Sequence, residues 1–130
     1  MSVSDPIADL LVSLKNASHA GRLEVVTSIS KFKLSILKVL KQEGFIDDYR
    51  NTGGKKANIV IRLKFYDREP AIRDVRRISK PGRRVYVEKD EIPTSLGSNR
   101  VWIMSTSQGI LTGEESSKRG VGGELICYVE

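Results

Sequence analysis

The sequence predicts an α+β fold, in which an N-terminal α-β-α-β-β unit packs on a β-rich second half with short helices. Three observations predict this class. The first half contains two segments with apolar residues at helical spacing, each followed by a stretch that reads as a strand. After residues 66–70 the helical period disappears, and short β-rich segments separated by glycine and proline follow. The chain contains no sequence repeat and no low-complexity segment.

The first predicted helix begins after Asp5. The carboxylate of Asp5 can accept hydrogen bonds from the free N–H groups of the first turn, and Pro6 suits a first helical position because no donor is needed there. The apolar stripe that follows consists of Ile7, Leu10, Leu11, Leu14 and Ala17. Gly21 is expected just past the helix end, and residues 23–28 form the first predicted strand.

The second predicted helix begins at Ser30 and ends before Gly44. Ser30 is a favourable N-cap, and glycine is typical just after a helix C-terminus. The apolar face of this helix consists of Phe32, Ile36, Leu37, Val39 and Leu40. Residues 45–49 and 58–65 then form two predicted strands, which the glycine-rich turn at residues 52–55 joins as a hairpin.

The predicted domain boundary is a linker at residues 67–70, between an N-terminal domain of residues 1–66 and a C-terminal domain of residues 71–130. The strands expected in the second domain are residues 71–78, 84–87, 101–105, 110–112 and 124–129. Residues 112–119 are expected to form a short helix, because its acidic residues lie near its N-terminus and its basic residues near its C-terminus.

The composition limits the classes of function. The chain has 130 residues, a net charge of +6, one cysteine and one histidine. These numbers exclude an internal disulfide and a Cys-rich zinc site, and they leave little for a catalytic triad. No apolar run approaches the roughly 20 residues of a membrane helix, and the N-terminus lacks the pattern of an export signal. We therefore expect a basic cytosolic protein that is not an enzyme and needs no metal, cofactor, membrane or small-molecule substrate.

Basic residues gather in residues 73–84, which contain five arginines, one lysine and one aspartate. Arginine can bind phosphate with a planar fork, so this run fits a nucleic-acid contact, although a solvated face fits it equally. Tyr86 follows on a predicted strand and either stacks on an unpaired base or is a half-buried sheet residue. Lys31 lies in the first turn of the second helix, where the helix dipole would favour a nearby phosphate.

An uncharged, hydroxyl-rich stretch lies at residues 101–113. Its hydroxyl and amide groups can form hydrogen bonds with base edges and 2′-hydroxyls, which makes it a candidate for reading a structured RNA. A nucleophilic serine is disfavoured, because the single histidine, His19, lies in the other half of the chain. The glycines of residues 120–123 lack a phosphate-loop motif. They permit close approach of a backbone, which is either another strand or a sugar-phosphate chain.

Several segments together resemble a known family. Residues 105–112 (Ser-Thr-Ser-Gln-Gly-Ile-Leu-Thr) and residues 122–129 are similar to the C-terminal signature of the ribosomal protein S8 family, in its bacterial length form. The opening helix, the second helix with its following strand, and the mid-chain turn of that family are matched by residues 5–11, 30–46 and 78–86. One departure is Ser98-Asn99-Arg100, where members often have Gly-Leu-Gly.

The resemblance implies a structural constituent of the small ribosomal subunit, with two small domains and its main RNA site in the C-terminal one. It implies binding to the central domain of small-subunit ribosomal RNA, help in the assembly of that domain, and contact with neighbouring small-subunit ribosomal proteins. It also implies, for bacterial members, translational repression of their own operon through its messenger RNA. The expected RNA-binding residues are Ser105, Thr106, Ser107, Gln108, Gly109, Gly122, Gly123, Glu124, Tyr86, Arg83, Arg84, Lys31, Lys33 and Lys55.

A second interpretation stays open, namely a small protein-docking or assembly module that uses its β-rich half to bind partners and has no intrinsic RNA specificity. In that case the positive charge serves solubility alone. A large exposed apolar strand would favour this docking interpretation. The RNA-binding interpretation instead requires residues 105–108 to lie at the surface beside the basic residues.

Overall fold

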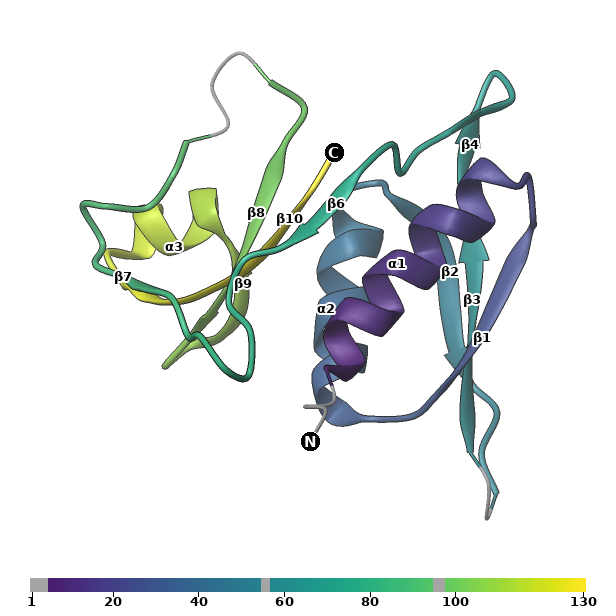
Figure 1. The fold of residues 1–130 in the computed structure, drawn as a ribbon, viewed down its shortest axis with the longest axis horizontal. Coiled ribbons are helices and arrows are strands. Elements are labelled where there is room, and N and C mark those ends of the chain that lie inside the picture. The colour runs from purple at the N-terminus through teal and green to yellow at the C-terminus, as the bar shows by residue number, and fades with distance from the viewer. Residues whose placement is uncertain (1–4, 55–56, 95–97) are drawn as a thin grey trace.

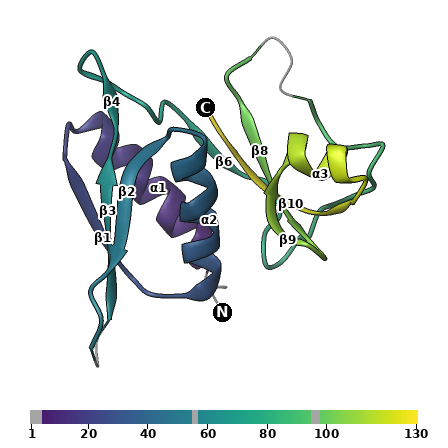
Figure 2. The ribbon, with the colours of Figure 1, turned by 180° about the vertical axis from the view of Figure 1, so that it is seen from behind.

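The computed structural model describes residues 5–54, 57–94 and 98–130, and its elements stack in layers (Figure 1). The two long helices of the N-terminal half lie between two sheets. The short third helix lies on the other side of the C-terminal sheet, as the view from behind also shows (Figure 2). This mixed architecture confirms the predicted α+β class. The elements are α1 (Pro6–His19), β1 (Glu24–Ser28), α2 (Lys31–Gln42), β2 (Ile46–Asn51), β3 (Asn58–Leu63), β4 (Phe65–Tyr66), β5 (Glu69–Pro70), β6 (Val75–Arg77), β7 (Tyr86–Val87), β8 (Val101–Thr106), β9 (Gly109–Thr112), α3 (Gly113–Arg119) and β10 (Gly123–Val129).

The helix starts follow from local capping. The Asp5 carboxylate accepts a hydrogen bond from the backbone N–H of Ala8 at 3.1 Å, and Ser30 Oγ accepts one from the N–H of Lys33 at 3.1 Å. Gly44 follows α2 with a φ of +82°, in the left-handed region that glycine adopts without strain. Both helices therefore begin and end within a residue or two of where the sequence places them.

The first sheet has the strand order β1-β3-β2, and all its pairs are antiparallel. Its inner face is covered by α1 and α2, because Ile59, Ile61 and Leu63 of β3 are buried while the residues between them are more exposed. The strands β4 and β5 form a short hairpin whose turn residues, Asp67 and Arg68, both have positive φ. The proposed linker at residues 67–70 lies in this hairpin.

The second sheet has the order β6-β10-β8-β9, and β7 pairs with the start of β10. Two predicted strands are shorter than expected, since residues 71–78 yield only β6 and residues 84–87 only β7. Backbone hydrogen bonds to β10 continue past β6, from the N–H of Ile78 to the carbonyl of Ile126 at 2.9 Å and from the N–H of Ser79 to that of Leu125 at 3.1 Å. The turn at residues 80–83 then separates this segment from β7. Thr112 caps α3 by accepting a hydrogen bond from the N–H of Glu115 at 3.0 Å.

The main core draws on both halves of the chain. It includes Leu14 of α1, Leu37 of α2, Ile61 of β3, Ile103 of β8 and Val129 of β10, each at most marginally exposed. The buried residues Met104, Leu125 and Tyr128 lie outside this main cluster. The second sheet thus packs into the main core through residues such as Ile103 and Val129. The loops of this sheet and the ends of its strands remain at the surface, where a binding site can form.

Candidate nucleic-acid interface

Four strands of the second sheet bring Tyr86, Glu124, Ser105 and Ile110 into one row. Tyr86 lies opposite Glu124 in the β7–β10 pair, and Glu124 lies opposite Ser105 in the β10–β8 pair. Ser105 in turn lies opposite Ile110 in the β8–β9 pair. Directly opposed residues of neighbouring strands share a face of the sheet. Ser105 of the uncharged stretch and the tyrosine beside the basic run therefore meet on one surface.

The β8–β9 turn presents the hydroxyl-rich residues to solvent. Ser107, Gln108 and Gly109 are exposed, whereas Ser105 and Thr106 are half-buried. Thr106 Oγ1 donates a hydrogen bond to the carbonyl of Gly109 at 2.9 Å and accepts one from the N–H of Gln108 at 3.1 Å. The Thr106 hydroxyl thus holds the turn closed, while no hydrogen bond within the described residues engages the Ser107 hydroxyl.

Glu124 is the centre of a polar network under this surface. Ser79 Oγ donates a hydrogen bond to Glu124 Oε2 at 2.5 Å, and Arg84 Nη1 donates to the same oxygen at 3.0 Å. Burial raises the pKa of the Glu124 carboxyl, but the hydrogen bonds from Ser79 and Arg84 lower it by more, so the net pKa lies below its ordinary value. Glu124 is therefore an ionised carboxylate at neutral pH. Ser79 Oγ also accepts from the N–H of Val85 at 3.1 Å, which ties the preceding turn to β10.

The glycines of residues 122–123 allow the strands to approach closely. A Cβ on Gly123 would lie 2.2 Å from the carbonyl oxygen of Ser105, and one on Gly122 would lie 2.5 Å from that of Val87. Neither distance is possible for a real side chain. Of the two explanations offered by the sequence, the structure thus shows close approach of neighbouring strands.

The basic run divides into engaged and free residues. Arg77 donates to the Asp5 carboxylate at 3.1 Å and to the carbonyl of Ile126 at 3.0 Å, so it has a structural task. Arg84 forms the ion pair with Glu124 and keeps nearly half of its side chain exposed. Arg83 is exposed in the turn that Pro81 and Gly82 form. The positive charge offered to a ligand is therefore smaller than the count of arginines in the sequence indicates.

The exposure of Tyr86 is 70%. Of the two alternatives from the sequence, the structure shows the solvent-facing one, and the ring is accessible for stacking. Arg119, which is not among the expected RNA-binding residues, also lies here, because its Nη1 donates to Gln108 Oε1 at 3.1 Å. Its position eleven residues after Gln108 gives no sequence signal for this contact, which depends on the packing of α3 beside β9.

The expected role of Lys33 conflicts with its position. Its side chain belongs to the buried residues, at 6% exposure, and its Nζ donates to Thr27 Oγ1, Ser28 Oγ and the carbonyl of Ser28 at 3.0–3.3 Å. An ammonium group used in this way cannot also pair with a phosphate at the surface, so the expected contact is corrected to a structural role. Lys31 is exposed, and Lys55 lies outside the described residues.

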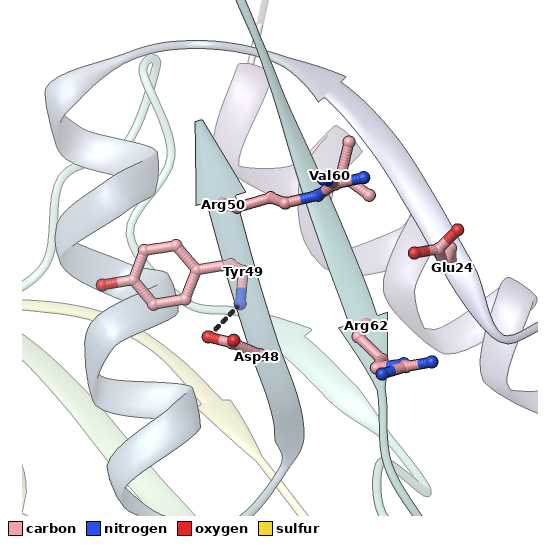
Figure 3. Close-up of a pocket in the computed structure, with 6 residues that line it drawn as sticks. All are labelled: Glu24, Asp48, Tyr49, Arg50, Val60 and Arg62. Atoms are coloured by element: carbon pink, nitrogen blue, oxygen red, sulfur yellow. Dashed lines mark hydrogen bonds between the residues drawn. The ribbon is translucent and has the colours of Figure 1, made fainter. Parts of the chain in front are cut away.

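The open face of the first sheet offers a contrasting surface (Figure 3). A hollow of ≈ 280 Å³ on this face is lined by two arginines, Arg50 and Arg62, and two acids, Glu24 and Asp48. The opposite charges balance there, so this face does not concentrate positive potential. Arg100, which departs from the family pattern, is likewise engaged within the protein, over the ring of Tyr128 at 3.9 Å from its centroid.

Metal-binding clusters and reactive thiols are two further kinds of functional site. Residues 5–54, 57–94 and 98–130 contain no cluster of three or more His, Cys, Asp or Glu side chains that could hold a metal ion. Burial raises the pKa of the Cys127 thiol to about 12, so it is not a nucleophile at neutral pH. None of the described helices is long and apolar enough to cross a membrane.

The fold and this surface define a small α+β protein whose polar and basic loops face outward. A sequence model of the family described as Ribosomal protein S8 matches residues 5–129. Three relatives carry the name small ribosomal subunit protein uS8. Those from Nitrosococcus oceani and Teredinibacter turnerae are 43% identical to the chain, and that from Vibrio cholerae is 42% identical, each over 129 residues and 99% of both chains. The chain therefore belongs to the ribosomal protein S8 family, and it is a structural, non-enzymatic component of the small subunit of the cytoplasmic ribosome.

Proposed function

We propose that the chain binds the central domain of small-subunit ribosomal RNA through its C-terminal part, residues 71–130, and helps that RNA domain to assemble. The observation that carries this proposal is the shared row of Tyr86, Glu124 and Ser105 beside an exposed, uncharged turn. Such a surface joins a stacking ring, a fixed acceptor and free hydroxyl groups, which suits an irregular RNA better than a regular duplex.

Attraction and selection are divided between different residues. Exposed cations such as Arg83 and Lys31 attract phosphates without regard to sequence, and this attraction weakens as salt rises. The turn residues Ser107 and Gln108 are uncharged and select by hydrogen bonds to base edges and 2′-hydroxyls. The Glu124 carboxylate accepts hydrogen bonds only, so it favours base amino groups and disfavours phosphates.

We propose that the same surface also binds the chain's own operon messenger RNA and so represses its translation. A messenger RNA that presents the same local shape as the ribosomal RNA would occupy the same residues, so the two RNAs exclude each other. Excess protein would then bind its messenger only after the ribosomal sites are filled.

The proposal is tested by binding the purified chain to a fragment of the central domain of small-subunit ribosomal RNA across a series of salt concentrations. We expect affinity to fall steeply with salt and to exceed that for a random duplex of the same length by about 10³-fold or more, as in other specific complexes. Nucleotide protection should cluster in one irregular helical segment. Equal affinity for the random duplex would refute the proposed specificity.

A further inference from the structure

Strand β1 is an outer strand of the first sheet, and it pairs only with β3 among the described residues. The carbonyl of Leu23 accepts a hydrogen bond from the N–H of Leu63 at 2.9 Å. Because hydrogen-bonded residues alternate along an antiparallel ladder, Val25 and Thr27 are the next residues to bond with β3. The residues between them, Glu24 and Val26, direct their N–H and C=O groups away from β3.

A groove runs between this free edge and helix α1, which lies beside β1 in both ribbon views (Figures 1 and 2). It consists of two hollows of ≈ 590 Å³ and ≈ 290 Å³, which share Ser13 of α1 and Val26 of β1 in their linings. The helix side of the larger hollow carries the small residues Ala17 and Ala20. Val26 is 62% exposed in spite of its apolar side chain. The edge is therefore accessible, and it is flanked by a helix that leaves room for another chain.

At the C-terminal end of the β1 edge, one outward-directed carbonyl already has a hydrogen-bond donor within the protein. Lys33 Nζ donates to the carbonyl of Ser28 at 3.3 Å, and that carbonyl belongs to the outward-directed set. This leaves Glu24 and Val26, which present two N–H donors and two C=O acceptors in the alternating pattern that an extended backbone complements. No backbone hydrogen bond to these four groups occurs among the described residues.

The charges around the groove favour a peptide over a nucleic acid. Two exposed carboxylates line the groove, Asp9 in the smaller hollow and Glu24 in the larger one, and neither forms an ion pair or side-chain hydrogen bond within the described residues. Glu24 also lies opposite Arg62 in the β1–β3 pair, so Asp9 is the carboxylate farther from a cation of the sheet. Arg22 is the exposed cation of the lining, and Lys33 has its amino group engaged. A phosphate chain would meet these two carboxylates, whereas the basic side chains of a peptide would pair with them.

We propose that β1 is a docking edge for an extended, basic segment of a neighbouring protein of the small ribosomal subunit, which adds to the first sheet as a further strand beside α1. The proposal goes beyond the RNA-binding function and uses residues on a different sheet. It differs from the docking role that the sequence left open as an alternative, because that role used the β-rich half of the chain.

Hydrogen exchange with mass spectrometry of residues 23–28 tests this proposal in the full chain. Three states are compared, namely the free chain, the chain bound to the ribosomal RNA fragment alone, and the chain within reconstituted small subunits. We expect the amides of Glu24 and Val26 to exchange at least about tenfold more slowly in the subunit than in the other two states. Equal exchange in all three states would overturn the proposal, and so would protection by the RNA fragment alone.

A pair of variants tests the edge directly. The substitution V26P removes an N–H group that points away from β3, so the β1–β3 ladder keeps its hydrogen bonds. The matched variant V26T keeps the N–H group and a β-branched side chain. When both compete for reconstitution into subunits, we expect V26P to be under-represented by about fivefold, as the loss of one hydrogen bond predicts.

The two variants should bind the RNA fragment equally, which separates this proposal from the RNA-binding function. Thermal unfolding of both variants shows whether V26P is folded, and the exchange experiment on the unaltered chain decides the question without either variant. Equal incorporation of folded V26P and V26T would contradict the docking edge.

Discussion

Thr106 and Ser107 are adjacent hydroxyl residues with different tasks. The Thr106 hydroxyl forms two hydrogen bonds within the β8–β9 turn, as donor to the carbonyl of Gly109 and as acceptor from the N–H of Gln108. The Ser107 side chain is exposed. A sequence of three hydroxyl residues does not reveal this division, because it depends on which side chain points back into the turn. In the proposed RNA-binding function, we therefore expect Ser107 to contact RNA directly and Thr106 to position the turn.

The substitutions Ser107→Ala and Thr106→Ala separate these two tasks. We expect both to weaken binding to the ribosomal RNA fragment by about two- to tenfold, the equivalent of one hydrogen bond, without changing the salt dependence. Only Thr106→Ala should also lower the free energy of unfolding, by about 1 kcal/mol, since it alone removes hydrogen bonds within the protein. Filter binding across a salt series and urea unfolding measure the two effects. A changed salt dependence for Ser107→Ala would mean that Ser107 acts through charge rather than by hydrogen bonding.

At the scale of the element, β10 organises the site because it lies between β8 and the pair β6 and β7. Its first residue, Gly123, allows β8 to approach so closely that no Cβ fits between the strands. The spacing of β10 and β8 in turn sets the position of Ser105 relative to Glu124. The glycine is thus a condition for the row that the proposed function uses.

The substitution Gly123→Ala should therefore affect both stability and binding. A methyl group 2.2 Å from the carbonyl oxygen of Ser105 must push β8 away, and overpacking of this kind costs about 1–3 kcal/mol. We expect a lower midpoint of urea unfolding and weaker binding to the RNA fragment. Gly82→Ala is the matched control, because a Cβ there meets nothing within 4 Å. Equal effects of the two substitutions would show that the close approach is not required.

Local signals predicted most of the elements. Caps such as Asp5 and Ser30 and the period of apolar residues placed the helices, since these signals act within a few residues. The extents of β6 and β7 were not predictable, because both strands are defined by pairing with β10, which lies at the far end of the chain. The site was predictable as a set of residue types around residues 105–108. The network of Ser79, Arg84 and Glu124 was not, since its members meet only through sheet pairing.

At the scale of the whole molecule, polar contacts join helix α1 to the second half of the chain. Asp5 pairs with Arg77 at 3.1 Å, Lys15 pairs with Asp74 at 2.8 Å, and His19 Nε2 lies 2.9 Å from the carbonyl oxygen of Arg73. With the shared core, these contacts tie the two proposed domains together. Two of the three are ion pairs that use a carboxylate, and for Asp74 the folded state favours the ionised form.

Acid should therefore destabilise the protein, with Glu124 as one identifiable source. The hydrogen bond from Lys15 likewise lowers the pKa of Asp74, so Glu124 is not alone in this behaviour. A carboxyl whose folded-state pKa is lowered contributes stability above its unfolded pKa, for which the ordinary value is 4.5 for Glu124. That contribution is lost as pH falls from about 4.5 through the lower, folded-state pKa, because the unfolded chain binds the proton first.

Glu124→Gln tests this account, because glutamine keeps the size of the side chain and removes its titration. Below about pH 4.5 the free energy of unfolding of the unaltered chain should fall more steeply than that of the variant, by at most about 1.4 kcal/mol per pH unit for a single group. Near pH 7 the variant should be the less stable protein, since Arg84 and Ser79 lose their ionised acceptor. Urea unfolding followed by circular dichroism from about pH 3 to about pH 7 measures both limbs. If the two proteins lose stability in parallel below pH 4.5, Glu124 is not held ionised by the network, and the acid sensitivity must come from carboxylates such as Asp74 at the contact between α1 and β6.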